Sequence, residues 1–225
     1  KVQDAIQLEA DIRIGIEKRE FAPHFQPLIN LESGKLIGFE ALARWNSSTR
    51  GFVFPSDFIQ LAEETGLIVD IDLMILEAGV AQLKQWQVEF NNPSLYLSSN
   101  LFCSHFYSKD IIHFIDKVLK KYDLSPECLR VELTERALID NAHIVLRNLK
   151  MLKKVGIKIL LDDFGTGYSS LSYLYRFPID VLKIDRSFIQ NMKAKEGNQA
   201  IVKTIIDLAK NMGMETIGEG VEHHE

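Results

Sequence analysis

Seven oxygen-bearing side chains stand in, or just past, the C-terminal halves of predicted strands, and they come from six different strands. They are Glu40, Asn100, Glu132, Asp162, Asp163, Asp185 and Glu219. A single carboxylate at a strand end is unremarkable, because it can cap the next helix or face water. Residues from six strands are harder to explain as caps, and α/β barrels build their sites at the carboxyl ends of their strands. We therefore expect these side chains to converge.

Convergence would bring six carboxylates beside one lysine, Lys183. Two like charges about 4 Å apart repel by about 4 kcal/mol at an effective dielectric near 20. Several such pairs would consume much of the roughly 5 to 15 kcal/mol by which a domain is stable. Bound cations would relieve this repulsion. Carboxylate and amide oxygens suit Mg2+, Mn2+ or Ca2+, whereas structural zinc would need Cys or His. The residue types therefore predict a site for a hard divalent metal.

Lys183 lies two residues before Asp185 on a predicted strand, so both side chains point to one face. A lysine beside cations is pushed toward its neutral form, which would suit a general base. A simple ion pair with a carboxylate explains the spacing equally well. Asp162 and Asp163 are adjacent and normally point to opposite faces. Both reach one site only if the strand ends there, before a mobile loop at 165–174.

The elements that must position these residues alternate along the chain. We predict a hairpin over 25–43, a helix capped by Ser56 and Asp57 that ends at Gly66, and a helix at 69–88. Strands are then expected at 95–100, 129–134, 157–161, 181–184 and 214–218, with helices at 110–122, 141–155 and 198–212. This alternation calls for parallel pairing, in a doubly wound sheet or a (β/α)8 barrel. A barrel aims all strand ends at one axis, so we favour the barrel.

Composition limits the class of protein. The chain has 225 residues, is 46% hydrophobic and 25% charged, and carries a formal net charge of -5. A general polyanion binder needs a basic surface, so we expect no DNA or RNA duplex as a partner. No apolar run approaches the roughly 20 residues of a membrane span. Two cysteines are too few for a disulfide framework and indicate a reduced, cytoplasmic environment. The chain begins at Lys1, so we expect a piece of a longer protein, with residues 1–20 as a leading helix or connector and 21–225 as one domain.

Five motifs in order resemble the signature of the EAL-domain family, the cyclic di-GMP phosphodiesterases. They are Phe39-Glu40-Ala41-Leu42-Ala43-Arg44-Trp45, Glu132-Leu133-Thr134-Glu135, the run from Asp162 to Leu171, Leu182-Lys183-Ile184-Asp185 and Glu219-Gly220-Val221-Glu222. A three-letter match would often arise by chance, but five motifs spanning 26–222 cover nearly the whole chain. The resemblance implies a modified TIM (β/α)8 barrel with an antiparallel first strand. The family continues for about one further helix and strand beyond Glu225, so we expect the final strand to be absent here.

The resemblance also implies an activity, which is hydrolysis of one phosphodiester bond of cyclic di-GMP to give linear pGpG. Mg2+ or Mn2+ would be required, and Ca2+ would inhibit. On the matching positions, one metal would be held by Glu40, Asn100, Glu132 and Asp162. Asp162 would bridge to a second metal. The residues around that metal or its waters would be Asp163, Asp185 and Glu219.

Further roles follow from the same resemblance. Lys183 matches the residue proposed to help activate the attacking water, and Glu135 matches the glutamate that anchors the loop after Asp163. Glu222 matches a supporting acid near the metals. Contacts to substrate are implied for Gln26, Leu42 and Arg44. The family habit of dimerising implies a homodimer, and a sensory or cyclase domain is expected elsewhere in the native chain.

Two other functions fit some of these observations. A degenerate family member could bind cyclic di-GMP as a receptor without cutting it, although such members usually lack some of the acids. A barrel with metal-bound acids and a strand-end lysine could instead abstract a proton beside a carboxylate, as enolase-type enzymes do. The chain also departs from the family in having Gly218, where Ala is usual before the last motif. This change should loosen the strand slightly.

Overall fold

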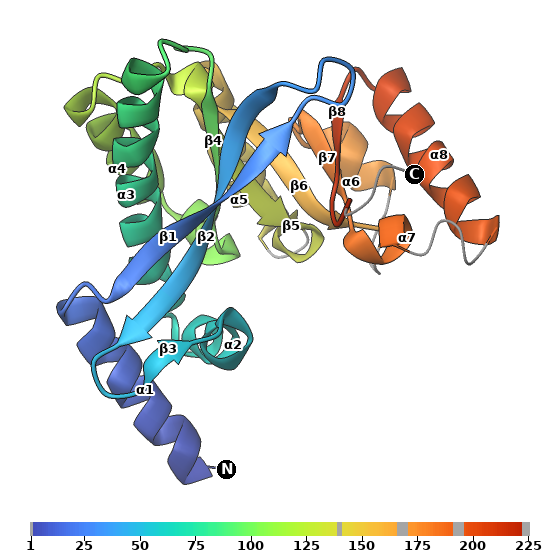
Figure 1. The fold of residues 1–225 in the computed structure, drawn as a ribbon. Helices are drawn as coiled ribbons and strands as arrows, with labels where there is room; N and C mark the ends of the chain where they lie inside the picture. The colour runs from blue at the N-terminus through green and yellow to red at the C-terminus, as the bar shows by residue number, and fades with distance from the viewer. Residues whose placement is uncertain (1, 139–140, 166–170, 191–195, 222–225) are drawn as a thin grey trace.

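The computed structural model describes residues 2–138, 141–165, 171–190 and 196–221 (Figure 1). Its strands are β1 (Phe21–Ile29), β2 (Leu36–Ser47), β3 (Gly51–Val53), β4 (Tyr96–Asn100), β5 (Leu129–Thr134), β6 (Lys158–Phe164), β7 (Val181–Ile184) and β8 (Glu215–Gly218). Its α-helices are α1 (Val2–Glu17), α2 (Pro55–Thr65), α3 (Ile68–Glu89), α4 (Asp110–Lys121), α5 (Ala142–Lys154), α6 (Leu171–Arg176), α7 (Arg186–Gln190) and α8 (Glu196–Asn211). Short 3-10 helices are η1 (Cys103–Tyr107), η2 (Pro126–Cys128) and η3 (Glu135–Leu138).

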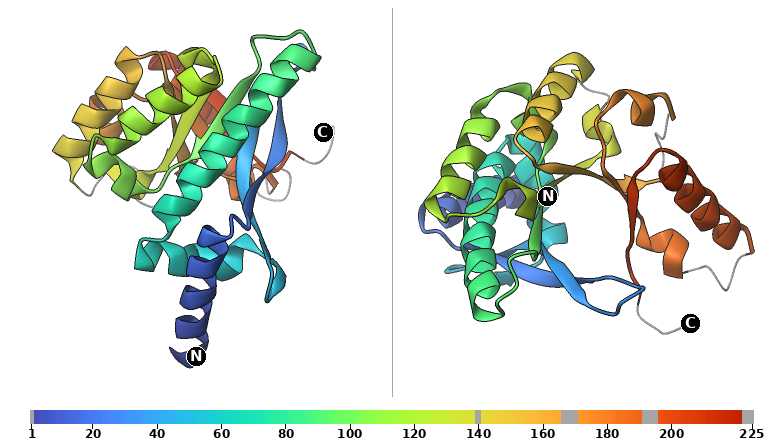
Figure 2. Two further views of the ribbon diagram at one scale, coloured as in Figure 1. Left: turned by 90° about the vertical axis from the view of Figure 1, so that its left-hand side faces the viewer. Right: turned by 90° about the horizontal axis from the view of Figure 1, so that it is seen from above.

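The strands form one curled sheet in the order β1-β2-β4-β5-β6-β7-β8, with β3 paired to β2. From β2 to β8 the neighbours along this path are parallel, and β1 alone among them runs antiparallel to its neighbour β2. The helices lie outside the curl, as the view from above shows (Figure 2). The predicted barrel with an antiparallel first strand is therefore confirmed. In the described residues β1 and β8 are the two edges of the sheet, so strand pairing does not close the barrel.

Strand register places the predicted site residues on one face of the sheet. Glu40 pairs with Ser98 and Asn100 pairs with Glu132, and side chains two residues apart on a strand share a face. The pairings Glu132 with Leu160, Leu160 with Val181 and Val181 with Glu215 carry the same face onward. Alternation from those pairs puts on it Asp162, Lys183 and Glu219. The inner face of the curl thus collects the polar residues that the strands carry.

The local sequence explains most element ends, but the start of α2 differs from the prediction. Phe54 is its N-cap residue and makes no side-chain capping bond, while Pro55 occupies the first turn. Ser56 and Asp57 therefore lie inside the helix, and the prediction that they cap it is wrong. Proline suits this place because its missing N–H would have no partner there. Gly66 ends the helix as predicted, with a left-handed φ of 75°.

The amphipathic helices cover the outer face of the sheet. In α4 the buried residues recur at helical spacing, as Ile111, Ile115, Val118 and Leu119. The leading helix α1 packs against the carboxyl end of β2. The two elements are so close that a Cβ on Gly15 would lie 2.8 Å from Nε1 of Trp45. Trp45 is fully buried and donates from Nε1 to Glu20 at 3.1 Å. These contacts anchor the strand that carries Glu40. The sequence did not predict β3, α6 or α7.

A polar cluster fills the amino end of the curl. Arg130 donates to Glu215 at 3.0 Å, and its guanidinium lies 3.6 Å from the centre of the Tyr96 ring. Lys158 donates to the other oxygen of Glu215 at 2.6 Å. Burial alone would raise the pKa of Glu215, but Lys158 and Arg130 outweigh burial and lower it. The residues at this end stabilise the barrel, which is typical of the amino ends of barrel strands.

No helix among the described parts of the chain is long and apolar enough to cross a membrane.

Candidate functional site

The ammonium of Lys183 lies among four carboxylates at the carboxyl ends of the strands. Its Nζ is 2.5 Å from Glu132, 2.6 Å from Glu219, and 3.3 Å from both Glu40 and Asp162. These acids come from β2, β5, β6 and the residue after β8, so four distant segments meet at one cation. Lys183 and Glu132 are each only 1% exposed. The expected convergence of strand-end acids is found in the structure.

Burial and mutual charge perturb the acid–base behaviour of this cluster. Loss of hydration raises the pKa of Glu132 to about 8, with Lys183 opposing the rise and two neighbouring carboxylates adding to it. Burial lowers the pKa of Lys183, but the four surrounding carboxylates outweigh burial and raise it above its ordinary value. Burial also raises the pKa of Glu219, against the effect of Lys183. Without a metal, Lys183 is therefore the internal counter-ion of the cluster.

Asn100 joins the cluster from β4. Its side-chain amide donates from Nδ2 to Glu40 Oε1 at 3.1 Å. This hydrogen bond leaves the amide oxygen of Asn100 as an acceptor, which is the atom that would bind a hard cation. The predicted oxygen donors of the first metal, Glu40, Asn100, Glu132 and Asp162, thus lie in one continuous group.

The side chains of Asp162 and Asp163 would point to opposite faces of a regular strand. A bulge in β6, rather than the end of the strand, changes their directions. The strand continues to Phe164, and its pairing with β7 shifts between Leu161 and Phe164. Asp163 has a left-handed φ of 53° and donates from its backbone N to Asp162 Oδ1 at 2.9 Å. Such a bulge re-aims side chains that would otherwise alternate. The prediction that β6 ends at residue 161 is wrong for this reason.

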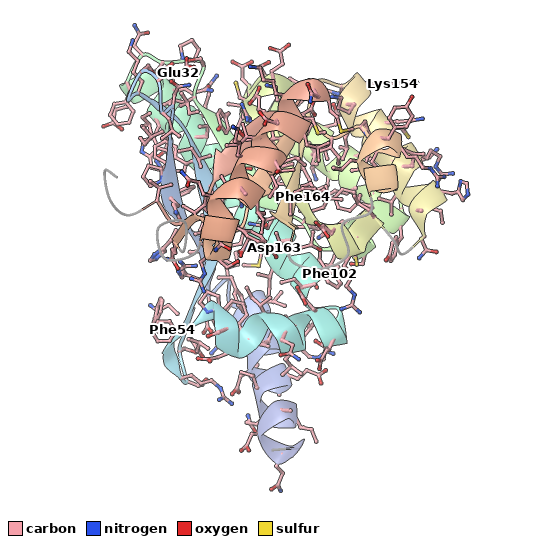
Figure 3. All side chains as sticks on the ribbon, turned by 90° about the vertical axis from the view of Figure 1, so that its right-hand side faces the viewer. Glu32, Phe54, Phe102, Lys154, Asp163 and Phe164 are labelled. Atoms are coloured by element: carbon pink, nitrogen blue, oxygen red, sulfur yellow. The ribbon has the colours of Figure 1, made fainter. Side chains whose placement is uncertain are left out.

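Asp163 and Asp185 flank the carboxylate cluster. Burial and the negative charges of Asp162 and Asp185 raise the pKa of Asp163. Burial would raise the pKa of Asp185 too, but hydrogen bonds from Ser187 outweigh it and lower the pKa. Ser187 N donates to Asp185 Oδ1 at 2.9 Å. Figure 3 shows Asp163 far from Glu32, which marks the hairpin turn at the amino end of β2.

Glu135 begins η3, directly after β5, and accepts a hydrogen bond from the backbone N of Gly165 at 3.0 Å. Gly165 has a left-handed φ of 98°, which glycine adopts without strain. The contact ties the segment after Phe164 to the neighbouring strand end. Most of the expected loop at 165–174 lies outside the described residues or has no described side chains, and Glu222 also lies outside them.

The three predicted substrate contacts lie on the hairpin of β1 and β2. Gln26 pairs directly with Glu40, so the two side chains share the inner face. Leu42 and Arg44 follow Glu40 at intervals of two and therefore lie on the same face. Gln26 is exposed, while Leu42 and Arg44 are half-buried. The hairpin thus presents a mixed polar and apolar strip beside the acids.

Sequence reasoning missed one buried acid near the site. Asp72 belongs to the apolar stripe of α3, between Ile71 and Ile75, and is 8% exposed. Its hydrogen bonds go to the segment that follows Asn100. An aspartate within an otherwise apolar helix face was the available signal, because an isolated buried carboxylate is costly unless it is paired.

The donor chemistry of the cluster fits a hard divalent cation. Several carboxylates and one amide oxygen face a common region, and an ammonium already offsets part of their charge. Across residues 2–138, 141–165, 171–190 and 196–221, no three His, Cys, Asp or Glu side chains are posed around a shared metal position. Because four of these carboxylates contact Lys183, metal binding would require them to exchange those contacts for contacts with the ion.

Comparison with known proteins identifies what the chain resembles. The sequence profile described as EAL domain matches residues 9–225. The chain is 36% identical over 220 residues to the bifunctional diguanylate cyclase/cyclic di-GMP phosphodiesterase MucR of Pseudomonas aeruginosa, covering 98% of this chain and 32% of MucR. It is 35% identical over 222 residues to the cyclic di-GMP phosphodiesterase PdeR of Escherichia coli, covering 99% of this chain and 33% of PdeR. The chain spans about a third of the length of the curated relatives it matches.

Solved structures share the fold. The MucR phosphodiesterase in complex with c-di-GMP superimposes with a TM-score of 0.89 at 36% identity, covering 97% of this chain and 88% of that one. The EAL enzyme Bd1971, with cAMP and cyclic di-GMP bound, gives a TM-score of 0.92 at 35% identity, covering 99% of this chain and 61% of the other.

Proposed function

Because the chain belongs to the EAL domain family, we propose that it is a metal-dependent phosphodiesterase that hydrolyses cyclic di-GMP to linear pGpG. The observation that carries the proposal is the meeting of Glu40, Glu132, Asp162 and Glu219 around Lys183. The c-di-GMP complex of the similar MucR phosphodiesterase supports the substrate, and the names of PdeR and MucR support the reaction.

The proposed metals are Mg2+ or Mn2+, with Ca2+ binding in an inhibitory way. One ion would be held by Glu40, Asn100, Glu132 and Asp162. The second would be held by Asp162 together with Asp163, Asp185 and Glu219. Such ions supply Lewis acidity toward water and offset the charge of the phosphate and leaving oxygens.

The chain's own residues would bind and orient the reactants. Arg44 offers a fixed fork of N–H donors, which suits a phosphate or a guanine edge. Leu42 gives an apolar contact to the ligand on the same strip, and Gln26 offers both a donor and an acceptor. Lys183 is proposed to hold or accept a proton near the attacking water. When cations bind the carboxylates that otherwise contact Lys183, the nearby positive charge favours the neutral amine over the ammonium. Glu135 would position the segment after Phe164 through Gly165.

Three further roles complete the proposal. Glu222 would support the metal-binding acids. Residues 1–20 would act as a connector to a sensory or cyclase domain, as the name of the longer, bifunctional relative MucR suggests.

We also propose a homodimer in the bacterial cytoplasm. Sedimentation of the chain with and without cyclic di-GMP tests the oligomeric state.

The decisive experiment measures product directly. The chain is incubated with cyclic di-GMP and Mn2+ or Mg2+, pGpG is followed by chromatography, and parallel samples contain Ca2+. Product is expected from the wild type and from Glu32→Ala, which changes an exposed acid at the far hairpin turn, and not from Glu40→Ala. Binding in Ca2+ without product in Mn2+ would favour a cyclic di-GMP receptor instead. Neither binding nor product would overturn both functions.

A further inference from the structure

The segment that directly follows Asn100 is held by buried polar side chains from outside the carboxylate cluster. Asp72 of α3 accepts a hydrogen bond at Oδ2 from the backbone N of Phe102 at 2.9 Å. The same oxygen lies 3.2 Å from Nε2 of His105, which donates to it from η1. Asp72 is 8% exposed and His105 is 6% exposed. A helix on the outside of the barrel is thus bonded to the backbone two residues beyond Asn100.

The two ends of this segment are fixed separately. Leu101 donates its backbone N to the carbonyl of Glu132 at 3.0 Å, which holds the start of the segment against β5. At the other end Asn148 of α5, which is fully buried, donates from Nδ2 to the carbonyls of Phe106 and Ser108 at 2.7 and 2.9 Å. Asp72 therefore holds the segment at Phe102, two residues beyond Asn100, and Asn148 holds its distant part.

A carboxylate is costly to bury at position 72, so the hydrogen bonds that it accepts must explain its presence there. Burial raises the pKa of Asp72 against the lowering effect of its hydrogen bonds to His105 and Phe102, so its ionised form carries a desolvation cost. Its helix neighbours Ile68, Ile71 and Ile75 are buried hydrocarbons. An apolar side chain of similar volume would pack there without that cost, since well-packed apolar replacements of buried charges are often neutral or stabilising. What an apolar residue cannot do is accept from Phe102 N–H and fix the direction of the chain there.

We propose that Asp72, itself oriented by His105, is a positioning residue that sets the backbone carrying Asn100 and so aims the Asn100 amide oxygen at the metal. This inference rests on the proposed function, because it takes Asn100 to be a ligand. It differs from that function in locating a determinant of metal affinity on α3, outside the EAL motifs. Outer partners that orient metal ligands typically change metal affinity or activity by about 10- to 100-fold when they are removed.

The test measures Mn2+ affinity by calorimetry on the full chain without substrate. Asp72→Ala is expected to weaken Mn2+ binding by at least about tenfold. Asp72→Asn keeps an acceptor oxygen for Phe102 N–H, so its affinity should stay within about threefold of wild type. The matched control is Asn148→Ala, which removes a buried polar side chain from the distant end of the same segment. It should lower the melting temperature while leaving Mn2+ affinity within about threefold.

A double-mutant cycle with Asn100→Ala separates positioning from general damage. If Asp72 acts through Asn100, then Asp72→Ala has no further effect on Mn2+ affinity once the Asn100 amide is gone. An equal loss in both backgrounds, or an equal loss in Asn148→Ala, overturns the inference. Should Asp72→Ala fail to fold, His105→Leu replaces it in the same cycle. Unchanged Mn2+ affinity in His105→Leu would then overturn the inference.

The two levels of the proposal fail differently. A wild type that binds Mn2+ and hydrolyses cyclic di-GMP, beside an Asp72→Ala variant of unchanged affinity, overturns only the positioning role. A wild type that neither binds Mn2+ nor makes pGpG overturns the positioning role together with the proposed function.

Discussion

Replacing Lys183 by methionine tests whether its ammonium is the internal counter-ion of the acid cluster. The change keeps an unbranched side chain that is one heavy atom shorter, and it removes the charge that lies 2.5 Å from Glu132 and 2.6 Å from Glu219. Removing one partner of a buried ion pair costs about 3 to 5 kcal/mol. For a domain of this size each kcal/mol lowers the melting temperature by about 2 to 4 °C, so metal-free Lys183→Met should melt about 6 to 20 °C below wild type.

The same substitution should strengthen metal binding. In the wild type a divalent ion must enter beside an ammonium, and two unit charges about 4 Å apart interact by about 4 kcal/mol at an effective dielectric near 20. Without Lys183 this repulsion is lost, and Mn2+ affinity measured by calorimetry should rise by at least about tenfold, or about 1.4 kcal/mol. The melting temperature should accordingly rise more on adding Mn2+ in the variant than in the wild type. Turnover of cyclic di-GMP should nevertheless fall, since Lys183 is the proposed proton carrier.

The control is Lys158→Met, which removes another lysine of the inner face from the opposite end of the barrel. Lys158 contacts Glu215 at 2.6 Å, but its side chain is 39% exposed. An ion pair so accessible to water contributes about 1 kcal/mol or less. Lys158→Met should therefore melt close to wild type and bind Mn2+ equally well. If Lys183→Met melts like wild type, or if its Mn2+ affinity is unchanged or weaker, the counter-ion reasoning is refuted.

Three further substitutions probe single contacts elsewhere in the chain. Glu135→Ala removes the acceptor for Gly165 N–H, so turnover should fall by at least about tenfold while Mn2+ affinity barely changes. Equal losses by kinetics and calorimetry would contradict that anchoring role. Gly38→Ala places a Cβ 2.5 Å from the carbonyl oxygen of Tyr96 and should cost about 1 to 3 kcal/mol in urea unfolding, whereas an unchanged midpoint would refute the clash. Glu215→Gln should lower the free energy of unfolding at neutral pH. Because the folded pKa of Glu215 lies below its ordinary value, the contribution of Glu215 is present above that ordinary value and is lost as pH falls through the folded pKa. Urea unfolding at pH 7 and pH 3 should show this gap closing, and a constant gap would count against the ion pairs.

Much of the fold could be predicted because its strands are short apolar runs between helices of regular period. The predicted bounds of β5 and β7 match the observed ones residue for residue. In β5 the apolar residues Leu129, Val131 and Leu133 alternate with polar ones, which is the period of two that is typical of a strand. In β7 three of the four residues are apolar, and Lys183 alone is charged. The short strand β3 has no such run, since Gly51 and Phe52 are exposed and only Val53 is buried. Pairing with β2, which no local pattern reveals, makes it a strand.

The site could be predicted in outline but not in detail. The rule that barrel strands aim their carboxyl ends at one axis brought Glu40, Glu132 and Asp162 together correctly. The bulge at Asp163 depends on its left-handed backbone, which aspartate adopts more readily than most residues but which the sequence pattern does not signal at this position. Asp72 reaches Phe102 from 30 residues away in the chain, and contacts of that kind follow from packing. For Lys183 the spacing allowed two interpretations, and the structure contains the ion pair with Glu132.

In the part of the chain that the structure describes, β1 and β8 each pair on one side only, and this bears on how that part behaves at high concentration. A free strand margin is a template on which another copy can add a strand. On β1, Pro23 and Pro27 lack the amide hydrogen that such addition requires, and proline in a sheet keeps its nitrogen turned away from the neighbouring strand. On β8 the free margin is only four residues long. The two prolines of β1 therefore disfavour the addition of a strand from another copy at that edge, and β8 is too short to pair with a long strand at the other edge.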